Sequence, residues 1–371
     1  METEFTQQTI SKLIEDYQSK YEALIDAKVR IAISGQSGSG KSSMINAILG
    51  KKVAQVGSTE TTENIINYSH NGLDFFDLPG CGTLKFPKET YVEKCELDDF
   101  DAVIVVTSSR FYENDYYLIS EMIKMNRPVY VVRSKMDESV QNEMRDNGLT
   151  QSEVFYKIRS DIQNNLKDLH VKGIYLISTV GPIREDFTSL LDDLQNNLHG
   201  IKKDRFIADV TPYSRDILDK KKNIAKSIVS NRAYMAALNG INPIPGLDIS
   251  IDISILMNMS KQVQMIYGLD EESLETLSKK MRNSQFVTVM KTRGAQYTAK
   301  FIAKEGVLLL LKRLAVTIGS KEILKFVPFV GQAVSAAIGY KMTDSFGCDL
   351  IDESDALAEE ILEKSMLFII K

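Results

Sequence analysis

Residues 35–42 read GQSGSGKS and fit the pattern G-x-x-x-x-G-K-[ST]. The preceding run, KVRIAISG (28–35), is apolar and of strand type, and residues 42–49 have the pattern of a helix. A glycine-rich turn between a strand and a helix lets backbone N–H groups surround phosphate oxygens, and the helix N-terminus adds a favourable dipole. The stretch therefore predicts a phosphate-binding loop, here called the P-loop.

Two side chains of the P-loop have expected roles in binding a nucleoside triphosphate. Lys41 would reach the β- and γ-phosphates, and the Ser42 hydroxyl would ligate Mg²⁺. The residues expected to contact the nucleotide here are Gly35, Ser37, Gly38, Ser39, Gly40, Lys41, Ser42 and Ser43.

Short apolar runs of strand type recur downstream of the P-loop. They are LDFFDLP (73–79), AVIVVTS (102–108), PVYVVRSK (128–135) and IYLISTV (174–180). Helix-like or turn-rich segments separate them, which favours a parallel, doubly wound sheet covered on both faces. ENIINYSH (63–70) followed by Asn71-Gly72 predicts a hairpin that adds one antiparallel edge strand. The expected fold is α/β, with a mixed, mostly parallel six-stranded sheet.

After about residue 200 the strand pattern ends and helical periodicity takes over. Helices are expected over 215–239, 247–268, 271–281 and 295–316, with breaks at 242–246, Gly268, Gly294, Gly319 and Pro328. Residues 1–27 also read as a helix, which is expected to pack with these. The predicted organisation is an N-terminal helix (1–27), an α/β domain (28–200) and a helical domain (201–371).

The composition is that of an ordinary globular protein, with 43% apolar and 26% charged residues and a net charge of −5. This balance excludes a protein that is basic throughout, as many nucleic-acid binders are. Three cysteines without a CxxC spacing argue against a disulfide framework or a structural zinc site, and they favour a cytoplasmic location. No apolar run reaches 18 residues, so no conventional membrane-spanning helix is expected.

Asp77-Leu78-Pro79-Gly80 ends a predicted strand downstream of the P-loop. Asp77 would hold Mg²⁺ through water, and the Gly80 amide would meet the γ-phosphate. In GSTETTE (57–63), Thr62 is expected to close the magnesium shell and sense the γ-phosphate. Thr61 is the alternative, and an ordinary helix cap or turn is the structural interpretation. The predicted catalytic residues are Lys41, Thr62 and Gly80, and the predicted metal ligands are Ser42, Thr62 and Asp77.

Ser134-Lys135-Met136-Asp137 closes another strand and is similar to the guanine signature [NT]-K-x-D. Asp137 would accept hydrogen bonds from N1–H and the exocyclic amine of guanine, a donor pair that adenine lacks. Lys135 would lie over the base. Ser178 and Thr179, at the end of IYLIST, are expected in the loop that touches the guanine carbonyl. Together these features favour GTP and GDP over adenine nucleotides.

The residue after Gly80 is Cys81, where a Ras-type GTPase carries a water-orienting glutamine. Slow intrinsic hydrolysis is therefore expected, unless the backbone, another loop residue or a second protomer positions the water. Arg110 follows a strand on the phosphate side of the sheet. It is a candidate catalytic or interface arginine, and a structural ion pair is the alternative.

Six segments in order resemble the immunity-related GTPases, the interferon-inducible family of vertebrates, and their bacterial relatives. They are GQSGSGKSSMINAILG, GSTETTENIINY, FFDLPGCGTLKFPKETYVEK, DAVIVVTSSRFYENDYYLISEMIK, VYVVRSKMDESVQNE and IYLIST. The resemblance covers about residues 28–200, and its family-specific marks include Tyr91 and Asn114-Asp115. It implies a Ras-like P-loop GTPase domain, one helical domain built from both termini, nucleotide-dependent association into a homodimer or oligomer, and action at membranes. It also implies that Glu60 contributes to contacts across a nucleotide-facing dimer.

Residues 276–304 contain seven basic and no acidic residues. The basic stretch, residues 279–304, would suit an anionic membrane surface and peripheral membrane association. The alternative is a helix face paired with acidic segments such as DESDALAEE (352–360). Nucleic acid is not favoured, because only Phe286 and Tyr297 offer stacking aromatics there.

These observations predict a Mg²⁺-dependent GTPase whose nucleotide state drives self-association at a membrane. A monomeric regulatory or assembly-factor GTPase that acts on RNA, the ribosome or a protein partner is the alternative.

Overall fold

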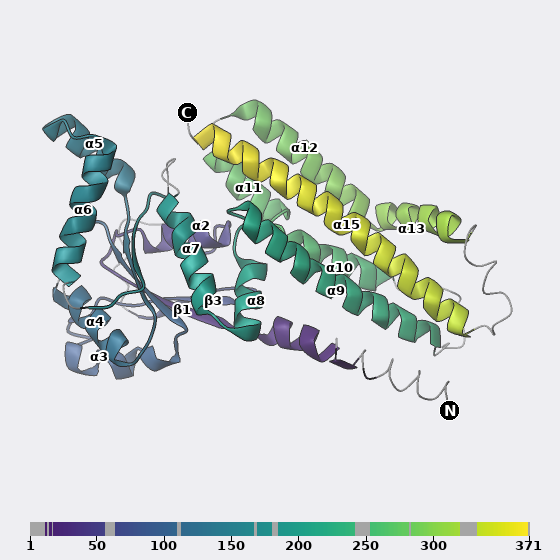
Figure 1. The fold of residues 1–371 in the computed structure, drawn as a ribbon, viewed down its shortest axis with the longest axis horizontal. Helices are drawn as coiled ribbons and strands as arrows, with labels where there is room; N and C mark the ends of the chain where they lie inside the picture. The colour runs from purple at the N-terminus through teal and green to yellow at the C-terminus, as the bar shows by residue number, and fades with distance from the viewer. Residues whose placement is uncertain are drawn as a thin grey trace. The chain divides into compact units, whose positions relative to one another are not determined.

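The computed structural model describes residues 18–55, 64–109, 113–166, 169–179, 185–241, 253–281, 283–319 and 332–369, together with residues 12, 15 and 16. The chain divides into two compact units. Ala27–Thr211 form an α/β unit, and Pro212–Phe368 join Met1–Asp26 in a helical unit. Figure 1 shows the sheet of the first unit and the long helices of the second.

A six-stranded sheet forms the centre of the α/β unit, in the order β2-β3-β1-β4-β5-β6. Its strands are β1 (Val29–Ser34), β2 (Ile66–His70), β3 (Leu73–Asp77), β4 (Ala102–Thr107), β5 (Val129–Arg133) and β6 (Gly173–Leu176). β2 pairs antiparallel with β3, and every other neighbouring pair is parallel. The predicted fold class is confirmed, including the hairpin, in which His70 pairs with Leu73 around Asn71-Gly72.

Helices cover both faces of this sheet (Figure 1). One face packs against α3 (Lys88–Lys94), α4 (Glu113–Lys124), α5 (Met136–Asn147) and α6 (Gln151–Leu166). The other face packs against α2 (Lys41–Leu49), α7 (Glu185–Asn197) and α8 (Gly200–Asp209). β4 is consequently buried along its whole length, which explains why its sequence, AVIVVT, does not alternate between apolar and polar residues.

The named helices of the helical unit all come from the C-terminal part of the chain. They are α9 (Arg215–Ile241), α10 (Ile253–Ile266), α11 (Glu271–Lys280), α12 (Ser284–Phe301), α13 (Lys304–Gly319) and α15 (Gln332–Ile369). Residues 18–26 are also helical, and the Tyr21 hydroxyl accepts a hydrogen bond from Nη2 of Arg232 on α9 at 2.7 Å. Residues 18–26 therefore pack within this unit, and most of the rest of the expected helix over 1–27 lies outside the described residues.

Gly294 is one position where the sequence prediction is wrong. The sequence predicts a break there before a helix over 295–316, but α12 continues through Gly294 to Phe301, and the break falls before Lys304. A Cβ atom at Gly294 would lie 2.6 Å from Cδ1 of Leu274 on α11. The glycine therefore allows α11 and α12 to pack closely.

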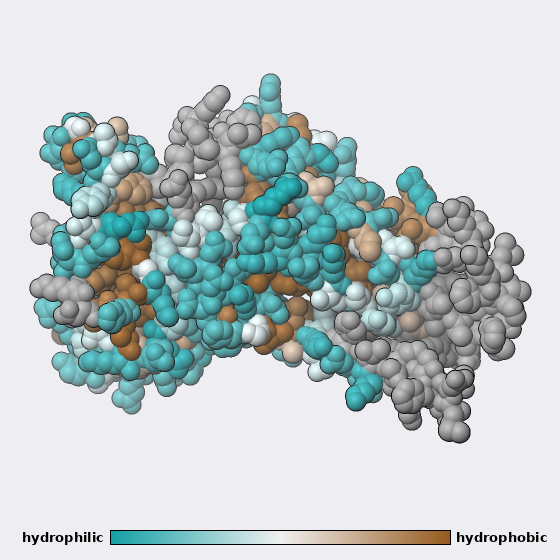
Figure 2. Space-filling view, in the orientation of Figure 1, coloured by the Kyte–Doolittle hydropathy of each residue, from teal (hydrophilic) through white to brown (hydrophobic). Residues whose placement is uncertain are grey.

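Several cations of the basic stretch form ion pairs inside the helical unit. Arg293 contacts Glu360 and Lys300 contacts Glu353, so that α12 is joined to α15. Lys279 lies 2.8 Å from Glu275. On the face drawn in Figure 2, the described surface of the helical unit is mainly hydrophilic. Across the described parts of the chain, no helix combines the length and the apolar character needed to cross a bilayer.

Candidate nucleotide-binding site

The P-loop joins β1 to α2, as its sequence predicts. Gly35, Gly38 and Gly40 adopt φ angles of 144°, 74° and 94°, which glycine tolerates far better than other residues. A Cβ atom at Gly35 would lie 2.1 Å from the carbonyl oxygen of Val106, whereas one at Gly38 would meet nothing within 4 Å. The loop is thus packed against β4 at its start and open in its middle, where a phosphate group has space beside the backbone.

Lys41, the first residue of α2, is a buried cation with 7% of its surface exposed. Its ammonium donates to the carbonyl oxygens of Gly35 at 2.8 Å and Gln36 at 3.2 Å. It also lies 3.6 Å from Oδ1 of Asp77, the buried last residue of β3. The structure therefore brings the predicted phosphate-binding lysine and the predicted metal-holding carboxylate together.

The residues around this pair are suited to Mg²⁺. Ser42 stands in the first turn of α2, directly after Lys41. A hydroxyl and a carboxylate oxygen are hard ligands, and Mg²⁺ in nucleotide sites uses one or two carboxylates together with substrate phosphates and water. Within the described residues, no cluster of three or more His, Cys, Asp or Glu side chains could hold a metal. The Ser42 hydroxyl and the Asp77 carboxylate are therefore suitable donors for a magnesium ion that a bound nucleotide also contacts.

Residues 134–137, here called the guanine motif, contact the P-loop through Ser134. Its Oγ donates to the carbonyl oxygen of Ser39. Lys135 has a φ of 53° and precedes the first turn of α5, which carries Asp137. The Ser178 hydroxyl donates to Oδ1 of Asp137 at 2.7 Å, so it orients that carboxylate. These residues follow parallel strands, so they lie with the P-loop at the edge of the sheet formed by the carboxyl ends of the strands. Open α/β sheets bind ligands at that edge.

Of the remaining predicted residues, some are described by the structure and some are not. Among the described ones, Ser37 and Gly80 are exposed, and Ser43 and Thr179 are half-buried. Thr62, with its alternative Thr61, and the interface candidates Glu60 and Arg110 lie outside the described residues.

Cys81 directly follows Gly80 and is buried. Burial raises the pKa of its thiol to about 11, so the thiol stays protonated at neutral pH. Because the thiolate is the reactive form of cysteine, a nucleophilic role is not supported.

Asn46 is a supporting residue next to the candidate site that sequence reasoning missed. It lies on α2 with 8% of its surface exposed. Its Oδ1 accepts hydrogen bonds from the backbone N–H groups of Val53 and Ala54, each at 2.8 Å, and its Nδ2 donates to the Ala54 carbonyl at 2.8 Å. It thereby fixes the chain just before the segment that contains Thr62. The available signal was one polar residue within the apolar run MINAIL (44–49).

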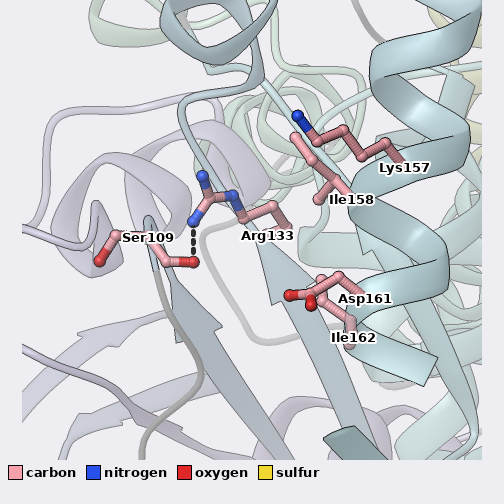
Figure 3. A pocket seen from close by; sticks show the side chains of 6 residues that line it. All are labelled: Ser109, Arg133, Lys157, Ile158, Asp161 and Ile162. Atoms are coloured by element: carbon pink, nitrogen blue, oxygen red, sulfur yellow. Dashed lines mark hydrogen bonds between the residues drawn. The ribbon is translucent and has the colours of Figure 1, made fainter. Parts of the chain in front are cut away.

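A separate hollow of about 250 Å³ lies beside the guanine motif. Figure 3 shows its lining, which consists of Ser109, Arg133, Lys157, Ile158, Asp161 and Ile162. The Arg133 guanidinium donates to the Ser109 carbonyl and, at 3.2 Å, to Oγ of Ser139 on α5. None of the described residues predicted to bind the nucleotide lines this hollow, so it is distinct from the candidate site.

Comparison with known proteins gives one family. A family model described as "Interferon-inducible GTPase (IIGP)" matches residues 1–363. "Interferon-inducible GTPase 1" of Mus musculus is 30% identical over 270 residues, which are 69% of this chain and 65% of that protein. "Interferon-gamma-inducible GTPase 10" of Mus musculus is 28% identical over 282 residues, 73% of this chain and 67% of that protein.

The chain thus spans about two thirds of the length of these curated relatives. Among solved structures, Toc33 from Arabidopsis thaliana is 13% identical with a TM-score of 0.33, covering 46% of this chain and 79% of that chain.

Proposed function

The chain belongs to the interferon-inducible GTPase family, a family of GTP-binding GTPases, and from this premise we propose that it hydrolyses GTP to GDP and phosphate with Mg²⁺ and self-associates according to its nucleotide state. One observation carries the proposal. The P-loop with its buried Lys41–Asp77 pair, at 3.6 Å, lies at the same edge of the sheet as the guanine motif, to which Ser134 connects it.

Each residue of the site has a proposed role. Lys41 stabilises negative charge on the β- and γ-phosphates, and the Gly80 amide faces the γ-phosphate. Ser42 and Asp77 hold Mg²⁺, which when bound neutralises further phosphate charge. Asp137, oriented by Ser178, accepts the two donors of guanine. We also propose that Thr62 completes the magnesium shell and senses the γ-phosphate. Glu60 and Arg110 are proposed to contact the partner protomer.

Leu84 supports self-association through the α/β unit. Its relative exposure is 105%, and it lies in the loop that follows Gly80. Two hydrogen bonds stabilise this loop. The Gly82 N–H donates to the Phe86 carbonyl at 2.9 Å, and the Lys85 ammonium donates to Oδ1 of Asn64 at 2.6 Å. A leucine held outward beside the nucleotide site would leave water when two such sites face each other, which is worth about 1.5–3 kcal/mol per side chain.

We therefore expect the GTP hydrolysis rate per protomer to rise with protein concentration over a range of about hundredfold, because mass action favours the associated state. Leu84→Ser should flatten this rise and leave the affinity for GDP unchanged. Tyr156→Ser, which removes another exposed apolar side chain of the same unit, is the control. The rate is measured by phosphate release, and association by light scattering. A flat rate from a monomeric protein would favour the alternative of a monomeric regulatory GTPase.

We also propose that the chain acts at a membrane surface through the basic stretch, residues 279–304. Lys279, Arg293 and Lys300 have acidic partners within the helical unit. Lys279 and Arg293 are exposed despite these partners, and Lys291 and Lys304 are exposed cations outside these three ion pairs. Each basic residue near an anionic surface contributes about 1 kcal/mol, so this pair supplies a weak attraction.

Sedimentation with vesicles that contain phosphatidylserine should accordingly show weak binding that added salt removes, since salt screens exposed charges. The double variant Lys291→Gln, Lys304→Gln should abolish this weak vesicle binding. Strong binding that persists in high salt would contradict this proposal.

A further inference from the structure

Tyr91 and Asn114 both contact the loop that contains Gly80. Tyr91 of α3 is fully buried, and its hydroxyl donates to the carbonyl oxygen of Pro79 at 2.6 Å. Asn114 of α4 donates from Nδ2 to the carbonyl oxygen of Cys81 at 2.7 Å. The Pro79 carbonyl, which shares a peptide group with the Gly80 N–H, and the Cys81 carbonyl, one residue past Gly80, are therefore each held by a side chain from a helix on the same face of the sheet.

The hydrogen bond of Tyr91 has a consequence for the direction of the Gly80 N–H. The Pro79 carbonyl and the Gly80 N–H belong to one peptide group, which is planar and trans. In such a group the C=O and N–H bonds point in opposite directions. A hydroxyl that holds the carbonyl toward α3 therefore aims the Gly80 N–H away from α3, and Gly80 itself is exposed.

We propose that Tyr91 is a positioning residue that presets the Gly80 N–H for the γ-phosphate of GTP, while Asn114 holds the backbone one residue past the same glycine. The inference rests on the proposed function, in which the Gly80 amide meets the γ-phosphate. GDP has no γ-phosphate. The hydrogen bond from Tyr91 therefore contributes to the affinity for GTP and not to the affinity for GDP.

The surroundings of Tyr91 suit this role. Burial raises the pKa of its hydroxyl well above the ordinary value, so the group remains a donor at every pH at which the protein is used. The hydroxyl also interacts with the side chains of Ser34, the last residue of β1, and Cys95, just after α3. The ring packs edge-on against Phe86 with the centroids 6.4 Å apart, so ring packing does not depend on the hydroxyl.

Tyr91→Phe removes the hydroxyl and keeps the ring, which makes it the sharpest test. The affinity for a non-hydrolysable GTP analogue should fall by about three- to tenfold, the value of one hydrogen bond, while the affinity for GDP changes by less than about twofold. The kcat for GTP should fall in the same variant. Affinities are measured by titration calorimetry at fixed Mg²⁺.

Tyr117→Phe is the matched control. The Tyr117 hydroxyl donates to the carbonyl oxygen of Lys88 at 2.8 Å, so it makes the same kind of bond between α4 and α3 without touching the loop of Gly80. It should leave the ratio of GTP to GDP affinity unchanged. Asn114→Ala, a second variant, should reproduce the selective loss of GTP affinity.

Equal losses for GTP and GDP in Tyr91→Phe, or no loss for either, would overturn the inference. A selective loss in Tyr117→Phe of the same size would do so too. Failure of the wild-type chain to bind either nucleotide would instead overturn the proposed function, and this inference with it.

Discussion

Asp137→Asn is expected to lower the affinity for GTP by about 10² to 10⁴ and to raise the affinity for xanthosine triphosphate. The Asp137 carboxylate is proposed to accept two charge-assisted hydrogen bonds from guanine, each worth about 1.5–3 kcal/mol. Asparagine removes the charge from one of these bonds and replaces the acceptor of the other by a donor, so we expect a loss of two to four powers of ten in affinity, at about 1.4 kcal/mol for each. An asparagine amide presents a donor where guanine also has one, whereas xanthine has a carbonyl group there and can accept.

The measurement is competition of unlabelled GTP and xanthosine triphosphate against a fluorescent nucleotide. Glu138→Gln removes the neighbouring carboxylate in the same first turn of α5 and is exposed, so it controls for the change in charge. Because Ser178 donates to Oδ1 of Asp137, the variant keeps a partner for the side-chain oxygen and should fold normally. Unchanged GTP affinity in Asp137→Asn would show that the guanine motif is assigned to the wrong residues.

The α/β fold could be predicted from the sequence because its signals are local. A buried parallel strand such as β4 appears as an uninterrupted apolar run, and the P-loop pattern marks where β1 turns into α2. Gly294 could not be predicted, since whether a glycine ends a helix or permits close packing depends on a partner such as Leu274, from another helix.

The same limit applies to the candidate site. The motifs identified the residues, but the hydrogen bonds that join them connect distant parts of the chain. Ser134 contacts the carbonyl of Ser39, 95 residues away, and Asn114 contacts that of Cys81, 33 residues away. A backbone carbonyl has no sequence signature, so a side chain that binds one is recognised only when the fold places the two together.

Lys41→Ala is expected to reduce kcat/KM for GTP by about 10² to 10³, which is the usual effect of removing one group that stabilises developing negative charge. The affinities for GTP and GDP should fall as well, since the ammonium is proposed to contact both the β- and γ-phosphates. Lys52→Ala removes an exposed lysine just after α2 and should leave the kinetics unchanged. Phosphate release under multiple turnover provides the rates.

Loss of Lys41 also leaves Asp77 as a buried carboxylate without the cation that lies 3.6 Å away. Breaking a buried ion pair costs about 3–5 kcal/mol, so Lys41→Ala should lower the unfolding temperature. A loss of activity in this single variant would therefore have two possible causes, a catalytic defect and a folding defect. Lys41→Met combined with Asp77→Asn separates the two, because it keeps the side-chain volume and removes both charges. The double variant should regain most of the thermal stability and none of the GTP hydrolysis. Recovery of hydrolysis along with stability would mean that the ion pair supports the fold and that Lys41 does not act on the phosphates.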